Sequence, residues 1–106
     1  MSTKTTAVYV SYPRKEGMTF NIDYYLNTHM KIVQKHWGPL GMKSWNIIQF
    51  DEGDPSGMYV QAILYWESRE AYDAAYKKAI PEVHGDLKNY TDVMPVRWTG
   101  KALLSG

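Results

Sequence analysis

A histidine at position 29 is the residue of this chain best placed to do chemistry. Between residues 21 and 37 apolar side chains recur at helical spacing, and His29 lies in the middle of that stripe rather than on its polar side. The stripe comprises Ile22, Tyr25, Leu26, His29, Ile32, Val33 and His36. A partly desolvated imidazole can act as a base near neutral pH. The alternative is a core histidine that is hydrogen-bonded for packing alone.

Asp86 is the second candidate. A short helical segment over residues 82–90 places Asp86 between Val83 and Tyr90 on its inward side. A buried carboxylate needs a partner, and the Nδ1–H of His29 or a tyrosine hydroxyl would serve. We therefore predict an oriented base in the manner of a catalytic dyad. The alternative is a hydrogen bond from Asp86 to nearby backbone, which aspartate often makes.

The sequence offers little support for metal or nucleotide chemistry. His29 and His36 stand two helical turns apart, or about 10 Å along the axis, which is too far for one ion. The chain has no cysteine, which excludes thiolate metal sites, iron–sulfur clusters and disulfides. Neither G-x-G-x-x-G nor a P-loop occurs. We expect no metal and no cofactor, and keep a haem with His29 as axial ligand as an alternative.

The elements that would position these residues follow the order β-α-β-β-α-β. β-Branched and aromatic residues indicate strands over residues 6–12, 43–50, 58–66 and 95–103. Helical spacing indicates one helix over residues 21–37 and a second that begins after Ser68 as its N-cap and ends before Pro81. Two right-handed crossovers then place both helices on one face of a four-stranded antiparallel sheet. We predict an α+β fold of the ferredoxin-like βαββαβ type.

Length and charge narrow the class of protein. A chain of 106 residues without a linker-like stretch predicts a single domain over residues 1–106. The net charge of +1, from 12 Lys+Arg and 11 Asp+Glu, offers no electrostatic footprint for nucleic acid. Apolar residues form neither a membrane-spanning run nor a leader-like stretch. We expect a cytoplasmic protein that binds neither nucleic acid nor membrane.

The strand over residues 58–66 suggests a partner subunit. Its two alternating sets are both largely apolar or aromatic, namely Met58, Val60, Ala62, Leu64 and Trp66 on one side and Tyr59, Gln61, Ile63 and Tyr65 on the other. A sheet with one face in water alternates more cleanly. A second copy packed on the other face would explain the pattern, and closed twofold dimers are the commonest assembly. We predict a homodimer.

Two motifs stand out in the helical stretches, namely Asp23-Tyr24-Tyr25 with Thr28-His29-Met30, and Gly85-Asp86 with Asn89-Tyr90-Thr91-Asp92. Together with Tyr12-Pro13, Phe20 and Pro95, they resemble the motifs of the EthD family. This resemblance covers nearly the whole chain. It implies the dimeric α+β barrel superfamily, which also holds cofactor-free polyketide monooxygenases and cyclases, muconolactone isomerases and haem-degrading enzymes. Two positions depart from the family's pattern: Lys31 follows the His-Met pair, and Trp98 stands where a glutamine is expected.

The aromatic content of 14% fits either aromatic packing or an aromatic-lined ligand cavity. Our leading hypothesis is a small, cofactor-independent enzyme or enzyme accessory that acts on an aromatic, polyketide-like or lactone-like compound. His29 would transfer a proton with Asp86 beside it, Tyr25 and Tyr90 would position the ligand, and His36 and Trp98 would contribute to the pocket. Monooxygenase, isomerase, cyclase and decarboxylase activities all remain open. The rival hypotheses are a non-catalytic dimeric module that binds a small apolar ligand in a degradation pathway, and a haem-binding protein.

Overall fold

A four-stranded antiparallel sheet forms one layer of the molecule, and the helices form the other. The computed structural model describes residues 5–106, so residues 1–4 of the predicted domain lie outside the described part. The strands are β1 (Thr6–Pro13), β2 (Met42–Gln49), β3 (Met58–Trp66) and β4 (Val96–Lys101). Their order across the sheet is β2-β3-β1-β4, and each neighbouring pair is antiparallel. This is the ferredoxin-like arrangement, so the predicted fold class is confirmed.

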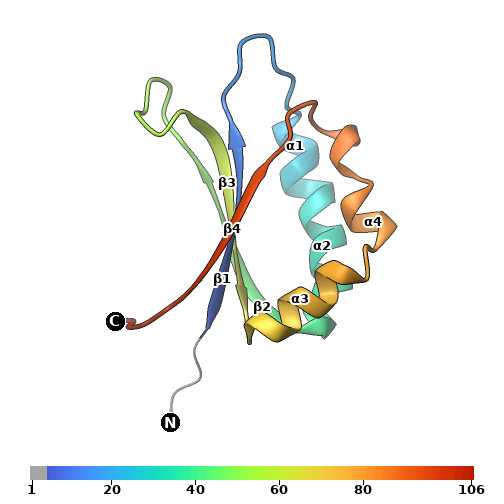
Figure 1. The fold of residues 1–106 in the computed structure, drawn as a ribbon. Helices are drawn as coiled ribbons and strands as arrows, with labels where there is room; N and C mark the ends of the chain where they lie inside the picture. The colour runs from blue at the N-terminus through green and yellow to red at the C-terminus, as the bar shows by residue number, and fades with distance from the viewer. Residues whose placement is uncertain (1–4) are drawn as a thin grey trace.

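The helices all lie on one face of this sheet (Figure 1). The first helical segment joins α1 (Ile22–Tyr24), the π-helical turn η1 (Tyr25–His29), α2 (Met30–Trp37) and the 3₁₀ turn η2 (Gly38–Leu40). The second joins α3 (Arg69–Lys77), α4 (Pro81–His84) and the 3₁₀ turn η3 (Leu87–Asn89). In the part of the chain that the structure describes, no helix has the length and apolar character needed to cross a bilayer.

The π-helical turn changes which residues of the first helix face the sheet. The N–H of Met30 donates to the carbonyl of Tyr25, five residues back, so the turn holds one extra residue and rotates the helix that follows. The buried side chains of this helix are Tyr25, His29, Met30, Val33 and Trp37. The predicted stripe was therefore wrong at Leu26, which is 43% exposed, and at His36, whose inward place Trp37 takes.

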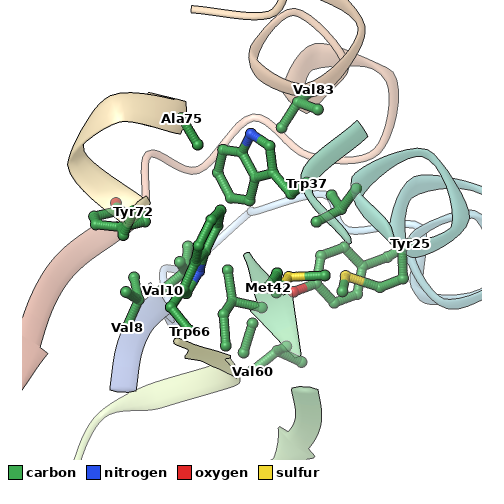
Figure 2. Close-up of a cluster of buried hydrophobic side chains, with 14 of the residues drawn as sticks. Val8, Val10, Tyr25, Trp37, Met42, Val60, Trp66, Tyr72, Ala75 and Val83 are labelled. Atoms are coloured by element: carbon green, nitrogen blue, oxygen red, sulfur yellow. The ribbon is translucent and has the colours of Figure 1, made fainter. Parts of the chain in front are cut away.

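The core lies between the helices and the inner face of the sheet (Figure 2). Val8, Val60 and Trp66 on β1 and β3 are completely buried. Trp37 of α2 packs edge-to-face against Trp66, with ring centroids 5.4 Å apart, and Tyr72 of α3 lies at the same centroid distance from Trp66. Much of the chain's aromatic content is thus used to hold the two layers together.

The outer face of the sheet has no helix over it in the described structure (Figure 1). Along β3, Val60, Ala62, Leu64 and Trp66 are buried, whereas the alternating residues Gln61, Ile63 and Tyr65 are half-buried. Tyr9 of β1 pairs with Ile63 on one side and with Trp98 of β4 on the other. The outer face therefore presents Tyr9, Ile63, Tyr65 and Trp98 to its surroundings.

Ser68 is the N-cap of α3, as the sequence predicted. Its hydroxyl accepts a hydrogen bond from the backbone N–H of Ala71 at 3.0 Å. The capped helix places Tyr72 and Ala75 in the core. By stabilising the start of α3, the cap helps to hold Tyr72 and Ala75 in the core.

We expect Ser68→Ala to lower the free energy of unfolding by about 1 kcal/mol, because an N–H at the helix start loses its acceptor. Urea unfolding at a fixed protein concentration measures the change. Ser105→Ala, at an exposed position near the end of the chain, is the control and should leave the stability unchanged. Equal stability of both variants would contradict a stabilising role for the cap.

Candidate functional site

A cavity of about 460 Å³ lies between the helices and the inner face of the sheet. This volume is in the range of small-molecule sites. The lining is mainly aromatic and apolar, with Tyr12, Tyr25, Trp37, Tyr76 and Tyr90 supplying its rings. Its polar groups include His29, His84 and Arg97. The cavity therefore combines an apolar wall with a small number of groups that could orient a ligand.

His29 and Asp86 meet at one side of this cavity. His29 is the last residue of the π-helical turn, and Asp86 precedes η3. Their side chains are joined through His29 Nδ1 and Asp86 Oδ2 at 2.9 Å, and the residues are 7% and 6% exposed. The structure thus brings together the two residues that the sequence analysis paired. Their catalytic role stays a prediction.

Asp86 is held as a carboxylate by several donors. The Tyr24 hydroxyl donates to Oδ1 at 2.7 Å, and Asn89 Nδ2 donates to the same oxygen at 2.8 Å. Burial by itself would raise the pKa of Asp86, but the hydrogen bonds from Asn89, Tyr24 and His29 outweigh it and hold the pKa below its usual value. An ionised Asp86 accepts from Nδ1–H, which leaves the lone pair of His29 on Nε2.

Burial also sets the protonation state of His29. Desolvation lowers the pKa of His29 below 6.5, and the positive charge of Arg97 acts in the same direction. The hydrogen bond to Asp86 and its charge oppose this shift without cancelling it. His29 is therefore a neutral imidazole at neutral pH, and its basic nitrogen Nε2, which lies 3.5 Å from the Tyr90 hydroxyl, can accept a proton.

Two tyrosines contact the imidazole of His29, and a third is hydrogen-bonded to one of them. Tyr25 stacks on His29 with ring centroids 5.5 Å apart and an interplanar angle of 14°. The Tyr90 hydroxyl lies 3.5 Å from His29 Nε2 and 2.7 Å from the Tyr12 hydroxyl. Burial raises the pKa of Tyr12, Tyr25 and Tyr90, so their hydroxyls stay protonated. Tyr25 and Tyr90 thus line the cavity beside the base, where the sequence analysis expected them to position a ligand.

His36 and Trp98 are not part of the cavity lining, and the predicted pocket must be corrected at both positions. The rotation introduced by the π-helical turn moves His36 away from the inner stripe and brings Trp37 into it. Trp98 is 46% exposed, and strand alternation turns it to the outer face of the sheet while its neighbour Arg97 lines the cavity.

Arg97, Trp37 and His84 are cavity residues that the sequence analysis did not assign to the site. Arg97 carried a signal, because alternation along β4 gives the residue before Trp98 the opposite face. Trp37 could be found only with knowledge of the extra residue in the π-helical turn. Within residues 5–106, no group of three or more His, Asp or Glu side chains is arranged to hold a metal ion.

Neither a protein-family model nor a curated protein sequence matches this chain significantly. A crystal structure of an EthD-like protein from Ralstonia eutropha JMP134 has a TM-score of 0.85 at 26% sequence identity. The similarity covers 99% of this chain and 97% of that one. This chain is therefore similar to an EthD-like protein over nearly its whole length. The resemblance drawn from its motifs is thereby confirmed.

Two more distant structures share the fold of this chain. A dimeric ferredoxin-like protein from an uncultured marine organism has a TM-score of 0.61 at 8% identity, covering 97% of this chain and 99% of that one. A mutant of SnoaB, a cofactor-independent oxygenase from Streptomyces nogalater, has a TM-score of 0.56 at 11% identity, covering 98% and 97%. At these identities the similarity concerns the fold alone.

Removing the charge of Asp86 and removing the charge of Arg97 should shift the pKa of His29 in opposite directions. Asp86→Asn removes a group that raises the pKa of His29, so the variant should titrate at a still lower pH. Arg97→Gln removes a charge that lowers this pKa, so the variant should titrate higher than the wild type. Proton NMR titration of the imidazole, assigned by comparison with His29→Gln, measures both shifts. Shifts of the same sign would contradict the arrangement.

The lowered pKa of His29 makes the stability of the wild-type protein depend on pH. Because folding lowers the pKa of His29 below 6.5, the unfolded chain takes up the proton first as the solution is acidified. The free energy of unfolding should therefore fall as the pH decreases through 6.5 toward the folded pKa. Urea unfolding across this window should show a shallower slope for His29→Gln than for the wild type. An identical slope would mean that His29 does not contribute.

Proposed function

We propose that this protein is a cofactor-independent enzyme that binds an aromatic, polyketide-like or lactone-like compound in the cavity and uses His29 to move a proton. One observation carries the proposal. The buried imidazole is oriented by an ionised Asp86 through Nδ1, and its Nε2 lies on the side of the aromatic-lined cavity where Tyr90 stands. A neutral, oriented and desolvated imidazole is the arrangement that general-base catalysis requires.

The proton transfer follows from this geometry. A substrate with an acidic C–H next to a carbonyl, or with a phenolic O–H, would lie with that proton against Nε2. His29 takes the proton and becomes an imidazolium, which the negative charge of Asp86 stabilises through Nδ1–H. The electron pair stays on the substrate as an enolate or phenolate, and the protonated Tyr90 hydroxyl can donate to its oxygen. Isomerisation, decarboxylation, cyclisation and oxygenation by a bound substrate anion can share such a proton transfer.

The distant fold neighbours are consistent with this chemistry. SnoaB is described as a cofactor-independent oxygenase, and a cavity of this fold that generates a substrate anion would serve such a reaction. The fold does not fix the activity, so the proposal depends on His29, Asp86 and the cavity of this chain rather than on the likeness.

Anthrone, a tricyclic aromatic ketone with an acidic CH₂ group, is a direct probe of this activity. We expect the protein to bind anthrone and to accelerate exchange of its CH₂ protons in D₂O, measured by NMR. His29→Gln should slow the exchange on the protein about 100-fold or more, the usual contribution of a positioned base, while the dissociation constant changes less than about threefold. His36→Gln, outside the cavity, is the matched control and should exchange at the wild-type rate.

Three other results would overturn this proposal. Tight binding of anthrone with no accelerated exchange in the wild type would favour a non-catalytic binding module. Equal exchange in the wild type and His29→Gln would remove His29 from the reaction. A Soret shift on adding hemin that His29→Gln abolishes, without anthrone binding, would favour a haem protein.

We also propose that the outer face of the sheet is covered by a second copy of the chain. Tyr9, Ile63, Tyr65 and Trp98 on this face are apolar or aromatic, and none is completely buried in the single chain. A contiguous apolar surface of this kind favours association. A fold neighbour is described as a dimeric ferredoxin-like protein. The cavity lies on the opposite face, so a partner on the outer face leaves its lining in place.

Light scattering should therefore show a dimer at micromolar concentration, and the melting temperature should fall on dilution. Ile63→Arg puts a charge in the middle of the proposed interface and should give a monomer. Leu26→Arg introduces the same charge at a 43% exposed position on the helical layer and is the control, which should stay dimeric. A wild-type protein that is monomeric at this concentration would refute the dimer.

A further inference from the structure

Arg97 is the cation of the cavity. It lies on β4 and lines the same cavity as His29, and its guanidinium stands over the ring of Tyr76 at 5.1 Å from the centroid. Among the described residues the ion pairs are His29 with Asp86 and Arg69 with Asp73, so no carboxylate of residues 5–106 is paired with Arg97. The cavity thus borders an exposed guanidinium that carries a positive charge and has no carboxylate partner among the described residues.

The surroundings of Arg97 are aromatic and contain further polar atoms. The Tyr76 ring lies 4.8 Å from the His84 ring, and the His84 ring lies 5.8 Å from the ring of Trp37. The buried atoms Trp37 Nε1 and His84 Nε2 have no hydrogen-bond partner in the structure. Figure 2 shows the Trp37 indole between Trp66 of the core and Val83 of α4, with its nitrogen on the Val83 side. This end of the cavity therefore has unused hydrogen-bonding capacity as well as charge.

We propose that the cavity is built for a ligand that carries a carboxylate, which Arg97 binds while the aromatic body of the ligand extends toward His29. The inference rests on the proposed ligand-binding function of the cavity and names the class of its ligand. The planar fork of a guanidinium fits the two oxygens of a carboxylate, and the flat face of Tyr76 keeps the fork in place.

The size of the cavity suits such a ligand. His29 and Trp37 both line the cavity from the same helical segment, and their separation of eight residues corresponds to about 12 Å along a helix axis. A fused aromatic system of two or three rings with one carboxylate spans a distance of this order. The neutral imidazole of His29 would then face the uncharged end of the ligand, where proton transfer does not compete with the carboxylate.

The alternative is that the cation–π contact with Tyr76 is the whole role of Arg97. The chain contains a matched control for this reading. Arg14 stands over the ring of Tyr59 at 5.0 Å, a nearly identical contact, and does not line the cavity. If Arg97 acted only through its cation–π contact, replacing Arg97 and replacing Arg14 should have the same effect on ligand binding.

Calorimetric titration with 2-naphthoate and 2-naphthamide tests the proposal, because the two probes share their shape and differ in charge at neutral pH. We expect the wild type to bind 2-naphthoate about tenfold or more tightly than 2-naphthamide, as charge-assisted hydrogen bonds allow. Arg97→Gln should remove this preference and leave the affinity for 2-naphthamide within about twofold. Arg14→Gln should keep the wild-type preference.

Two further measurements keep the test decisive. If Arg97→Gln does not fold, Arg97→Lys retains the charge without the fork and should show a smaller preference than the wild type. Raising the salt to about 1 M, where the Debye length is about 3 Å, should weaken binding of 2-naphthoate but not of 2-naphthamide.

The possible failures are distinguishable from those of the proposed function. Binding of both probes with equal affinity in the wild type would overturn the carboxylate inference and leave the aromatic-binding function standing. An equal loss of preference in Arg97→Gln and Arg14→Gln would also overturn it, because the effect would not come from the cavity. Binding of neither probe, together with no binding of anthrone, would remove the proposed function itself.

Discussion

The hydrogen bond between His29 and Asp86 is the contact on which the site depends. It joins residues 57 positions apart in the sequence and ties the first helical segment to the segment after α4. A carboxylate that is 6% exposed is costly unless donors surround it, and Tyr24 and Asn89 complete that set. The network fixes the tautomer of the imidazole and directs its free nitrogen toward Tyr90.

Desolvation shifts the pKa of His29 and the pKa values of the nearby tyrosines in opposite directions. It lowers the pKa of His29 and raises the pKa of Tyr12, Tyr25 and Tyr90, so the histidine stays a base while the phenols stay donors. Aromatic side chains achieve this with few rotatable bonds, since a stacked or edge-to-face ring is rigid as well as apolar. The same packing that stabilises the fold therefore keeps His29 neutral and the tyrosine hydroxyls protonated.

The two faces of the sheet carry different sets of side chains. On β4 the neighbours Arg97 and Trp98 face opposite ways, the first into the cavity and the second toward the outer surface. On β3 the alternation separates Leu64, which lines the cavity, from Tyr65 on the outer face. Because the side chains of a strand alternate strictly, the proposed ligand site and the proposed dimer surface use different residues of the same sheet.

The sequence by itself determined the fold class and named His29 and Asp86 as possible partners, whereas the tertiary structure decided that they meet. Strand and helix periodicity, the N-cap at Ser68 and the inward position of one histidine are local properties that a chain displays before it folds. Its motifs likewise indicated the resemblance to the EthD family, and the structural likeness to an EthD-like protein confirms that resemblance. The tertiary structure alone decided which helix residues border the cavity. The π-helical turn at Tyr25–His29 inserts one residue, which an ideal 3.6-residue periodicity does not anticipate, and so replaces His36 by Trp37. The position of Arg97 was also a tertiary outcome, because only the folded chain brings β4 next to Tyr76 and the other aromatic residues of the cavity.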